Sequence, residues 1–118
     1  MSERLIPCER IRRKKDFISL YKSGQRIRGR YFSLVVRPNV LGYSRLAVVV
    51  SKKVGPAVAR NRVKRLIRDI FRRSKGVIQE PSDVIVVARK EILDLTTADL
   101  RASYIQAMES IRRKRTES

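Results

Sequence analysis

The sequence contains no histidine and only a single cysteine among its 118 residues. Without histidine, the chain lacks the most common general base, an imidazole–imidazolium pair for RNA cleavage, and every histidine metal ligand. The lone Cys8 has no partner for an internal disulfide, and we interpret it as a small side chain near a chain end. These absences exclude the most familiar hydrolytic sites and favour a reducing, cytoplasmic setting.

Acidic residues are also scarce, with 11 Asp and Glu against 29 Lys and Arg. A metal-dependent nuclease needs two or three carboxylates that converge on one site. The closest spacing of two acids that resembles such a motif, Glu91 to Asp94, falls in a predicted loop, and there is no Cys/His cluster and no glycine-rich nucleotide-binding loop. We therefore predict no catalytic residue and no metal site in this polypeptide.

Long apolar runs are absent as well. No stretch approaches the roughly 20 apolar residues of a membrane span. The first residues, Met1 to Pro7, contain no apolar segment of the kind that a secretion signal carries. We therefore expect no membrane association.

The composition is typical of a small, strongly basic globular protein. Hydrophobic residues make up 42% of the chain, enough for a core rather than a disordered tail, and the net charge is +18. A charge of this size attracts polyanions, and nucleic acid is the default partner. We predict one RNA-binding domain over residues 1–118, with residues 1–9 and 115–118 flexible.

The basic residues concentrate between residues 51 and 75, where ten are Lys or Arg and one, Asp69, is acidic. Gly55-Pro56 breaks the preceding element, and nothing interrupts a helix over residues 57–73. At 100° per residue, one arc of roughly 140° is apolar and an adjoining arc of roughly 100° is polar. The apolar arc holds Val63, Leu66, Ile67, Ile70 and Phe71, and the polar arc holds Asn61, Lys64, Arg65, Arg68 and Arg72.

An amide within that basic arc indicates recognition rather than solubility alone. Asn61 offers a donor and an acceptor at fixed geometry, whereas Arg and Lys offer charge and donors to phosphate. The plain alternative is a solvated face on which Arg65 and Asp69 form an ordinary i,i+4 pair. Because a merely solvated face would interleave charges of both signs, the near absence of acids favours a ribose-phosphate partner.

The other segments predict a mixed fold: a helix at 16–23 ending at Gly24, a short strand at 26–28, strands at 31–37, 45–51 and 83–89, and a helix at about 97–113. Strand 45–51 is apolar almost throughout, so we expect it to be central and to pair antiparallel with 31–37 across their short link. Thr96 and Asp99 form a weak capping box for the last helix. The result is a single-domain α+β sandwich in the order α-β-β-(β)-α-β-α, with a mixed sheet and a βαβ unit.

The run Ser51-Lys52-Lys53, followed by Ala59-Arg60-Asn61-Arg62-Val63-Lys64-Arg65-Leu66-Ile67-Arg68, resembles the protein component of bacterial ribonuclease P. The resemblance extends over roughly residues 10–113. It implies that the βαβ crossover is left-handed, although the general rule predicts a right-handed one. It also implies a surface that contacts the catalytic RNA, made of Lys52, Lys53, Arg60, Asn61, Arg62, Lys64, Arg65 and Arg68.

Phe17 and Tyr21 are four residues apart and share one helix face. Aromatic residues at this spacing are usually core anchors, but they can also form a platform on which unpaired bases stack. The resemblance implies the second role, in a cleft that holds the single-stranded 5′ leader of precursor tRNA, with Phe32 as a third cleft residue. Val35 stands where the family often carries an aromatic residue that faces the cleft, so one stacking partner is replaced here.

Ribonuclease P hydrolyses precursor tRNA to leave the mature 5′ end, using Mg²⁺ held by its RNA subunit. The resemblance therefore implies a cytoplasmic accessory subunit without a cofactor of its own, one copy per ribonuclease P RNA, that also binds precursor tRNA. A ribosomal or ribosome-assembly RNA-binding protein fits the composition equally well. A DNA-binding regulator fits less well, because no second helix follows the basic one within three or four residues.

Overall fold

The computed structural model describes residues 10–78 and 80–117, and it describes side chains as far as Ile111. Its elements are α1 (Lys14–Ser23), β1 (Gln25–Arg28), β2 (Phe32–Pro38), β3 (Arg45–Val50), α2 (Ala57–Arg73), the 3-10 helix η2 (Lys75–Val77), β4 (Ser82–Ala88), the 3-10 helix η3 (Lys90–Asp94) and α3 (Thr97–Glu117). Cys8 and the segment 1–9, predicted to be flexible, lie outside the described residues.

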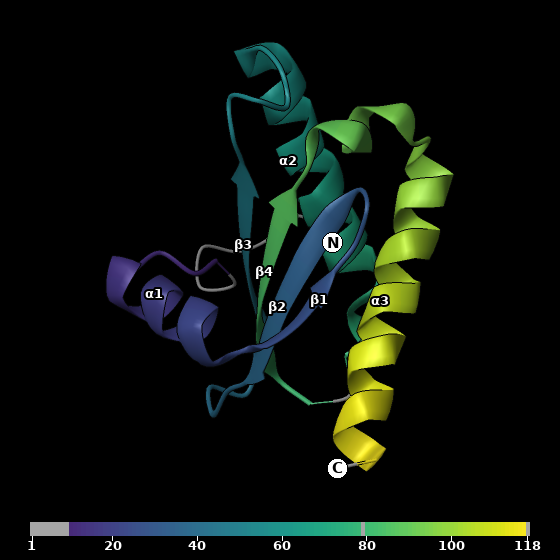
Figure 1. Cartoon of the computed structure of the whole chain (residues 1–118). Helices are drawn as coiled ribbons and strands as arrows, with labels where there is room; N and C mark the ends of the chain where they lie inside the picture. Colours follow the sequence, from purple (N-terminus) through teal and green to yellow (C-terminus); the bar gives the residue numbers. More distant parts are fainter. Residues whose placement is uncertain (1–9, 79, 118) are drawn as a thin grey trace.

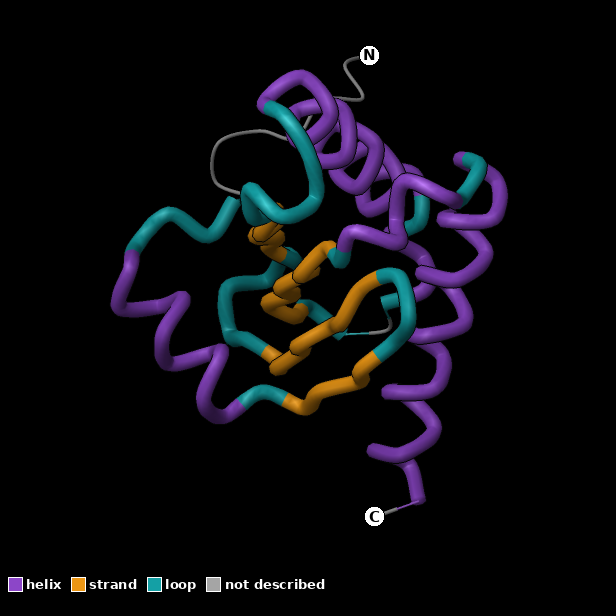
Figure 2. The backbone as a smooth tube through the Cα atoms, turned by 45° about the horizontal axis from the view of Figure 1, so that its top comes forward, coloured by secondary structure: helices purple, strands orange, loops and turns teal. Residues whose placement is uncertain are grey.

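The elements form layers, with α1 on one face of the sheet and α2 and α3 on the other (Figures 1 and 2). The main core lies between the sheet and the α2–α3 layer, and a smaller cluster of Leu20, Val35 and Ile85 lies under α1. This arrangement confirms the predicted α+β sandwich.

The strand order is β1-β2-β4-β3, and only the β3–β4 pair is parallel. The predicted pairing of segment 31–37 with segment 45–51 is therefore wrong, because β4 lies between them. Val84, Ile85 and Val86 of β4 are at most 1% exposed. A strand that is apolar on both faces removes the most apolar surface from water at the centre of a sheet, which explains why β4 takes that position.

The prediction that segment 45–51 is central is also wrong, because β3 is the last strand of this sheet. Residues 10 and 11 pair with its outer side at one point, where Arg10 forms a parallel bridge with Leu46 and the Ile11 amide donates to the Leu46 carbonyl at 3.1 Å. β3 and β4 are joined through α2, so the predicted βαβ unit is present. The handedness of the crossover stays a prediction of the resemblance.

Helix α2 has the predicted bounds and follows the predicted pattern. Val63, Ile67, Ile70 and Phe71 are buried in the main core, and Leu66 is half-buried. Each fully buried side chain of this size stabilises the fold by about 1.5–3 kcal/mol at most. Since the apolar stripe faces the core, the rest of the helix surface is left for its basic residues.

Helix α3 begins at Thr97, directly after Thr96 of the predicted capping box. The Asp99 amide donates to the Thr96 hydroxyl oxygen at 3.1 Å, which satisfies one of the unpaired donors of the first turn. The helix then continues to Glu117, past the predicted end at about 113. Its core contacts recur at the predicted spacing, at Leu100, Tyr104, Met108 and Ile111.

Candidate nucleic-acid interface

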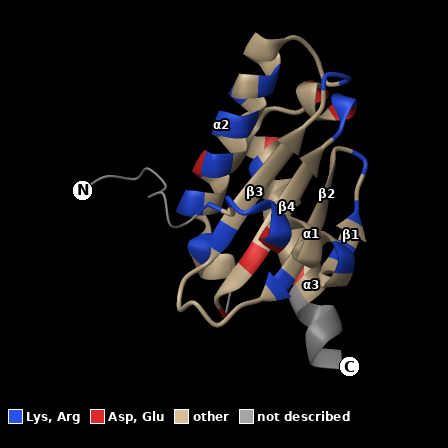
Figure 3. Ribbon diagram, turned by 90° about the vertical axis from the view of Figure 1, so that its left-hand side faces the viewer, with Lys and Arg blue, Asp and Glu red and all other residues tan. Residues whose placement is uncertain are grey.

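The outer side of α2 carries a groove of about 710 Å³. Four of the predicted RNA-binding residues line it, namely Asn61, Lys64, Arg65 and Arg68. They come together because they occupy neighbouring turns of one helix face, and Figure 3 shows the basic residues following one another along α2. The groove also contains Arg10 and Arg72, which were not among the predicted site residues.

Arg10 reaches this groove through its bridge to β3, which places it beside α2. Burial lowers the pKa of Arg68 from its ordinary value, and the positive charge of Arg10 lowers it further. Two guanidinium groups are thus held near each other, and an anion between them would relieve their repulsion. Strand pairing alone places Arg10 here, so no helical pattern predicts it, whereas Arg72 lies four residues after Arg68 on the same arc.

The acid inside the groove has its own partners. Asp69 forms ion pairs with Arg72 and, at 3.0 Å, with Arg73. The pair of Arg65 with Asp69, which the solvated-face alternative supposed, is not formed among the described residues. Arg65 is exposed and lines the groove.

The remaining predicted contacts lie elsewhere around the start of α2. The Arg60 Nε donates to the Gly55 carbonyl at 3.2 Å, so its guanidinium is tied to the loop before the helix. Arg62 is exposed at the side of a second, largely apolar groove of about 370 Å³ between α2 and the η3–α3 segment. Lys52 and Lys53 are exposed on the connection from β3 to α2. Of the run Arg60-Asn61-Arg62, only Asn61 therefore lines the groove on the outer side of α2.

A third groove, of about 240 Å³, lies on the face of the sheet that α1 partly covers. Tyr21 lies at its edge, and its ring stacks on Phe17 with 6.1 Å between centroids and 15° between planes. The Arg26 guanidinium carbon is 4.6 Å from the centroid of the Tyr21 ring, and Arg26 also donates to the Tyr21 carbonyl. The Arg26 cation therefore lies over the face of the Tyr21 ring, beside the groove.

Three arginines line this groove: Arg26, Arg28 and Arg89. Sequence reasoning missed all three. In the β1–β2 register, Arg26 faces Val35 and Arg28 faces Ser33, and residues two apart on a strand share a face. The spacing of Arg26 and Arg28 indicates from sequence that the two residues share a face of a strand. Which face of the sheet they occupy depends on the strand register.

Phe32, predicted as a cleft residue, is in the wrong place for that role. It is 6% exposed and packs in the main core among Ile67, Ile70, Leu100 and Tyr104, on the side of the sheet away from α1. Alternation along β2 puts Phe32 on that side and Val35 on the α1 side. Val35 lines the groove, while the half-buried Phe17 packs against the small core cluster under α1.

The two basic grooves suit different features of a nucleic acid. The α2 groove offers cations and an amide without an aromatic ring, as a folded phosphate surface requires. The sheet groove combines guanidinium groups with a stacked aromatic pair, as an unpaired strand requires. Within the described part of the chain, no three His, Cys, Asp or Glu residues are grouped to hold a metal ion, and no helix is both long and apolar enough to cross a bilayer.

A family model described as ribonuclease P matches residues 5–112. The ribonuclease P protein component of Thermotoga petrophila is 42% identical over 92 residues, which are 78% of this chain and 79% of that protein. Its counterpart in Syntrophus aciditrophicus is 38% identical over 96 residues, or 81% of each chain.

Solved structures agree with these matches. The RNase P protein from Thermotoga maritima superposes with a TM-score of 0.77 at 37% identity, over 86% of this chain and 96% of that one. A Staphylococcus aureus RNase P protein, a mutant with defective mRNA degradation activity, superposes with a TM-score of 0.81 at 35% identity, over 89% of each chain. The chain therefore belongs to the ribonuclease P protein family.

Proposed function

We propose that this chain is the protein subunit of a ribonuclease P, that it binds the RNA subunit and the 5′ leader of precursor tRNA, and that it carries no catalytic group itself. The RNA subunit holds the Mg²⁺ that the hydrolysis requires, one protein binds each RNA, and the particle works in the cytoplasm. The observation that carries the proposal is the presence of two basic grooves with no lining residue in common, one without and one with an aromatic platform.

The α2 groove is the proposed contact with the RNA subunit. Arg65, Arg68 and Lys64 present forked and single cationic donors to phosphate oxygens, and Asn61 adds an amide that can pair with a ribose or a base edge. Neutralising phosphates reduces the repulsion between RNA segments that must pack together. The protein would thereby lower the metal concentration at which the particle is active.

The groove on the sheet is the proposed site of the leader. A base can stack on the platform that Tyr21 forms with Arg26, while Arg28 and Arg89 bind the phosphates on either side of it. Only the precursor has a leader to fill this groove. Contacts made there raise the affinity for precursor without raising the affinity for the mature product.

The test is reconstitution with the matching RNA subunit, using single variants in each groove. Arg68→Ala should weaken binding of the RNA subunit by roughly five- to tenfold, because it removes one partly buried cation that binds phosphate. Tyr21→Ala should leave assembly unchanged and lower the affinity for precursor, but not for mature tRNA. Arg101→Ala removes the same charge from an exposed position on α3 outside the three grooves, and it should change neither quantity.

Two results would contradict the proposal. Cleavage of precursor tRNA by the purified polypeptide without RNA would place catalysis in the protein. Recovery of ribosomal RNA, rather than a ribonuclease P RNA, as the species that co-purifies would favour the ribosome-assembly alternative.

A further inference from the structure

Helix α1 is held to the sheet by few apolar side chains. Leu20 is its only fully buried side chain among the described residues, and it packs on Val35 and Ile85. Ile18 and Tyr21 are 41% and 42% exposed. One buried leucine, with the half-buried Phe17 beside it, can fix the distance between the helix and the sheet, but it leaves rotation about the helix axis weakly determined.

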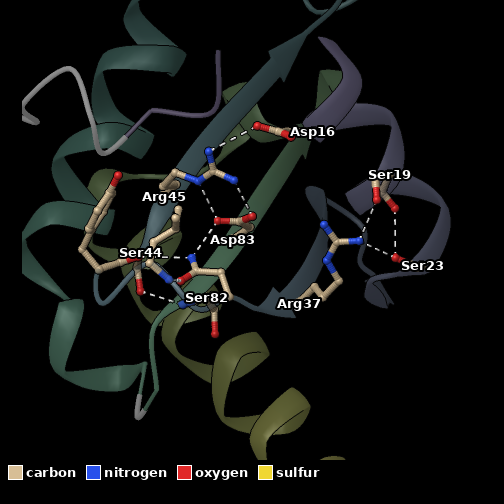
Figure 4. Close-up of polar contacts among 11 residues, drawn as sticks. Asp16, Ser19, Ser23, Arg37, Ser44, Arg45, Ser82 and Asp83 are labelled. Atoms are coloured by element: carbon tan, nitrogen blue, oxygen red, sulfur yellow. Dashed lines mark hydrogen bonds and ion pairs between the residues drawn. The ribbon is translucent and has the colours of Figure 1, made fainter. Parts of the chain in front are cut away.

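Polar side chains on β2 and β3 supply the missing constraint (Figure 4). The Arg37 Nη1 donates to the hydroxyl oxygens of Ser19 at 2.9 Å and Ser23 at 2.6 Å. The Arg45 Nη1 lies 3.5 Å from the Asp16 carboxylate. All three α1 residues are thus held by arginines that come from the sheet.

A buried carboxylate, Asp83, fixes Arg45 and also places a negative charge near Arg37. In the sheet register, Asp83 of β4 is opposite Arg37 on one side and opposite Arg45 on the other. Asp83 is 2% exposed, and both of its oxygens accept hydrogen bonds from Arg45, at 2.9 and 2.7 Å. A two-pronged bond of this kind restricts the guanidinium far more than a single contact would.

The contacts from Arg37 and Arg45 lie on one side of the α1 helix. At 100° per residue, Asp16, Ser19 and Ser23 fall within an arc of about 60°, on one side of Leu20. Phe17 and Tyr21 fall on the other side of Leu20, within about 100° of it by the same geometry. Leu20 is therefore the pivot, with the Arg37 and Arg45 contacts on one side and the stacked aromatic pair, which Arg26 also contacts, on the other.

We propose that Arg37, together with Arg45, sets the rotation of α1 about Leu20 and so positions the Phe17–Tyr21 stack over the groove on the sheet. Arg37 is a positioning residue that acts through Ser19 and Ser23, and it need not touch RNA. The inference rests on the proposed function, in which that groove holds the leader of precursor tRNA.

The experiment compares three variants in the reconstituted holoenzyme: Arg37→Ala, the double change Ser19→Ala with Ser23→Ala, and the triple combination. Each is assayed for its affinity for precursor and for mature tRNA. Arg37→Ala should lower precursor affinity roughly three- to tenfold, less than the removal of a whole stacked base would, and leave mature tRNA affinity unchanged. The serine pair should reproduce this effect, and the triple variant should be no worse than Arg37→Ala, because the three residues act as one unit.

A second measurement reports on the position of α1 directly. The ring-proton resonances of Phe17 and Tyr21 in the free protein should shift in Arg37→Ala and in the serine pair, and they should stay in place in Arg101→Ala. Arg37→Lys retains a positive charge and N–H donors on a shorter side chain that lacks the guanidinium geometry, so it should restore part of the precursor affinity. Both serines are exposed, so the double serine variant should fold. It therefore still tests the proposal if Arg37→Ala does not fold.

The inference is overturned if the serine pair is silent while Arg37→Ala weakens precursor binding, since Arg37 would then contact RNA itself. An equal decrease in affinity for precursor and mature tRNA would overturn it as well. Tyr21→Ala separates this failure from that of the proposed function. If Tyr21→Ala lowers precursor affinity and Arg37→Ala does not, the leader site stands and only the positioning role fails, whereas silence of Tyr21→Ala counts against the leader site.

Discussion

Gly24 directly follows α1, as the sequence predicted, but the reason for glycine there is steric rather than conformational. Its φ of −71° is accessible to any residue. A Cβ at this position would lie 2.5 Å from Val35 Cγ1 and 2.8 Å from the Leu20 carbonyl oxygen. Glycine lets α1 approach β2 closely enough for Leu20 to be buried.

Gly24→Ala should therefore destabilise the fold by about 1–3 kcal/mol, the usual cost of overpacking. Urea unfolding would measure the change. Gly76→Ala is the matched control, because a Cβ there has no neighbour within 4 Å and the backbone φ is not positive. Equal destabilisation of the two variants would show that the clash with Val35 is not the cause.

Asp83 is a buried acid whose charge is retained. Burial alone would raise the pKa of Asp83, but hydrogen bonds from Arg45 and Asn39, with the charges of Arg45 and Arg37, lower it below the ordinary value. A carboxyl with a lowered pKa in the folded state adds stability above its unfolded pKa of about 3.9. That contribution disappears as the pH falls through the lower, folded-state value.

Asp83→Asn should cost about 2–4 kcal/mol at pH 7, because Arg45 loses its charged partner in a mostly buried site. The cost should shrink as the pH falls below about 4, since the wild-type carboxyl is then being protonated too. Unfolding free energies between about pH 2.5 and 7 would measure this. The exposed Asp94→Asn provides the comparison, and a cost for Asp83→Asn that is constant with pH would contradict the assignment.

At the scale of elements, α2 presents three surfaces rather than two. Its apolar stripe enters the core, its outer face forms the 710 Å³ groove, and Arg62 lies beside the apolar groove shared with η3 and α3. Leu66 lines both grooves and so marks the boundary between them. A helical wheel found the first two surfaces, but the third exists only because η3 and α3 pack nearby.

The start of α3 gives a test of local structure. Thr96→Ala removes the hydroxyl that accepts from the Asp99 amide, and it should cost about 1 kcal/mol, as removal of an N-terminal cap does. Thr97→Ala at the neighbouring exposed position should change stability by less than about 0.5 kcal/mol. Thermal unfolding of both variants would decide, and an equal change in the two would argue against a capping role for Thr96.

At the scale of the whole molecule, the charge of +18 makes affinity for any polyanion strong and dependent on salt. Specific binding must come from where the cations are held. Arg10 and Arg68 are brought together at the edge of β3, and Arg26, Arg28 and Arg89 around the groove beside α1. The sheet sets the positions of these arginines, so a change that disturbs the sheet should also disturb both grooves.

The salt dependence of binding to the RNA subunit tests this. Removing one cation that binds phosphate should reduce the slope of log K against log salt concentration by about 0.7–0.9. Arg65→Ala combined with Arg68→Ala should therefore flatten the slope by roughly 1.5, while Arg101→Ala should leave it unchanged. A flattening by Arg101→Ala that is half as large as that of the double variant would indicate that only total charge matters.

The sequence by itself determined α2 and its two-sided character, because helical periodicity and charge are local properties that no packing partner needs to supply. It also determined the family, through the run from Ser51 to Arg68, and the start of α3, through Thr96. The absence of histidine follows from composition alone, and the absence of a paired-acid motif follows from the spacing of the acids along the chain.

The tertiary structure decided the rest. Strand order depends on which strand hides the most apolar surface, so β4 displaced β3 from the centre, and no short link could reveal that. Register then decided which side of the sheet each residue faces, placing Phe32 in the core and Arg26 and Arg28 in the groove, because a shift of one residue would exchange the two faces. Arg10 joined Arg68 only through pairing between distant segments, a proximity that has no local signature in the chain.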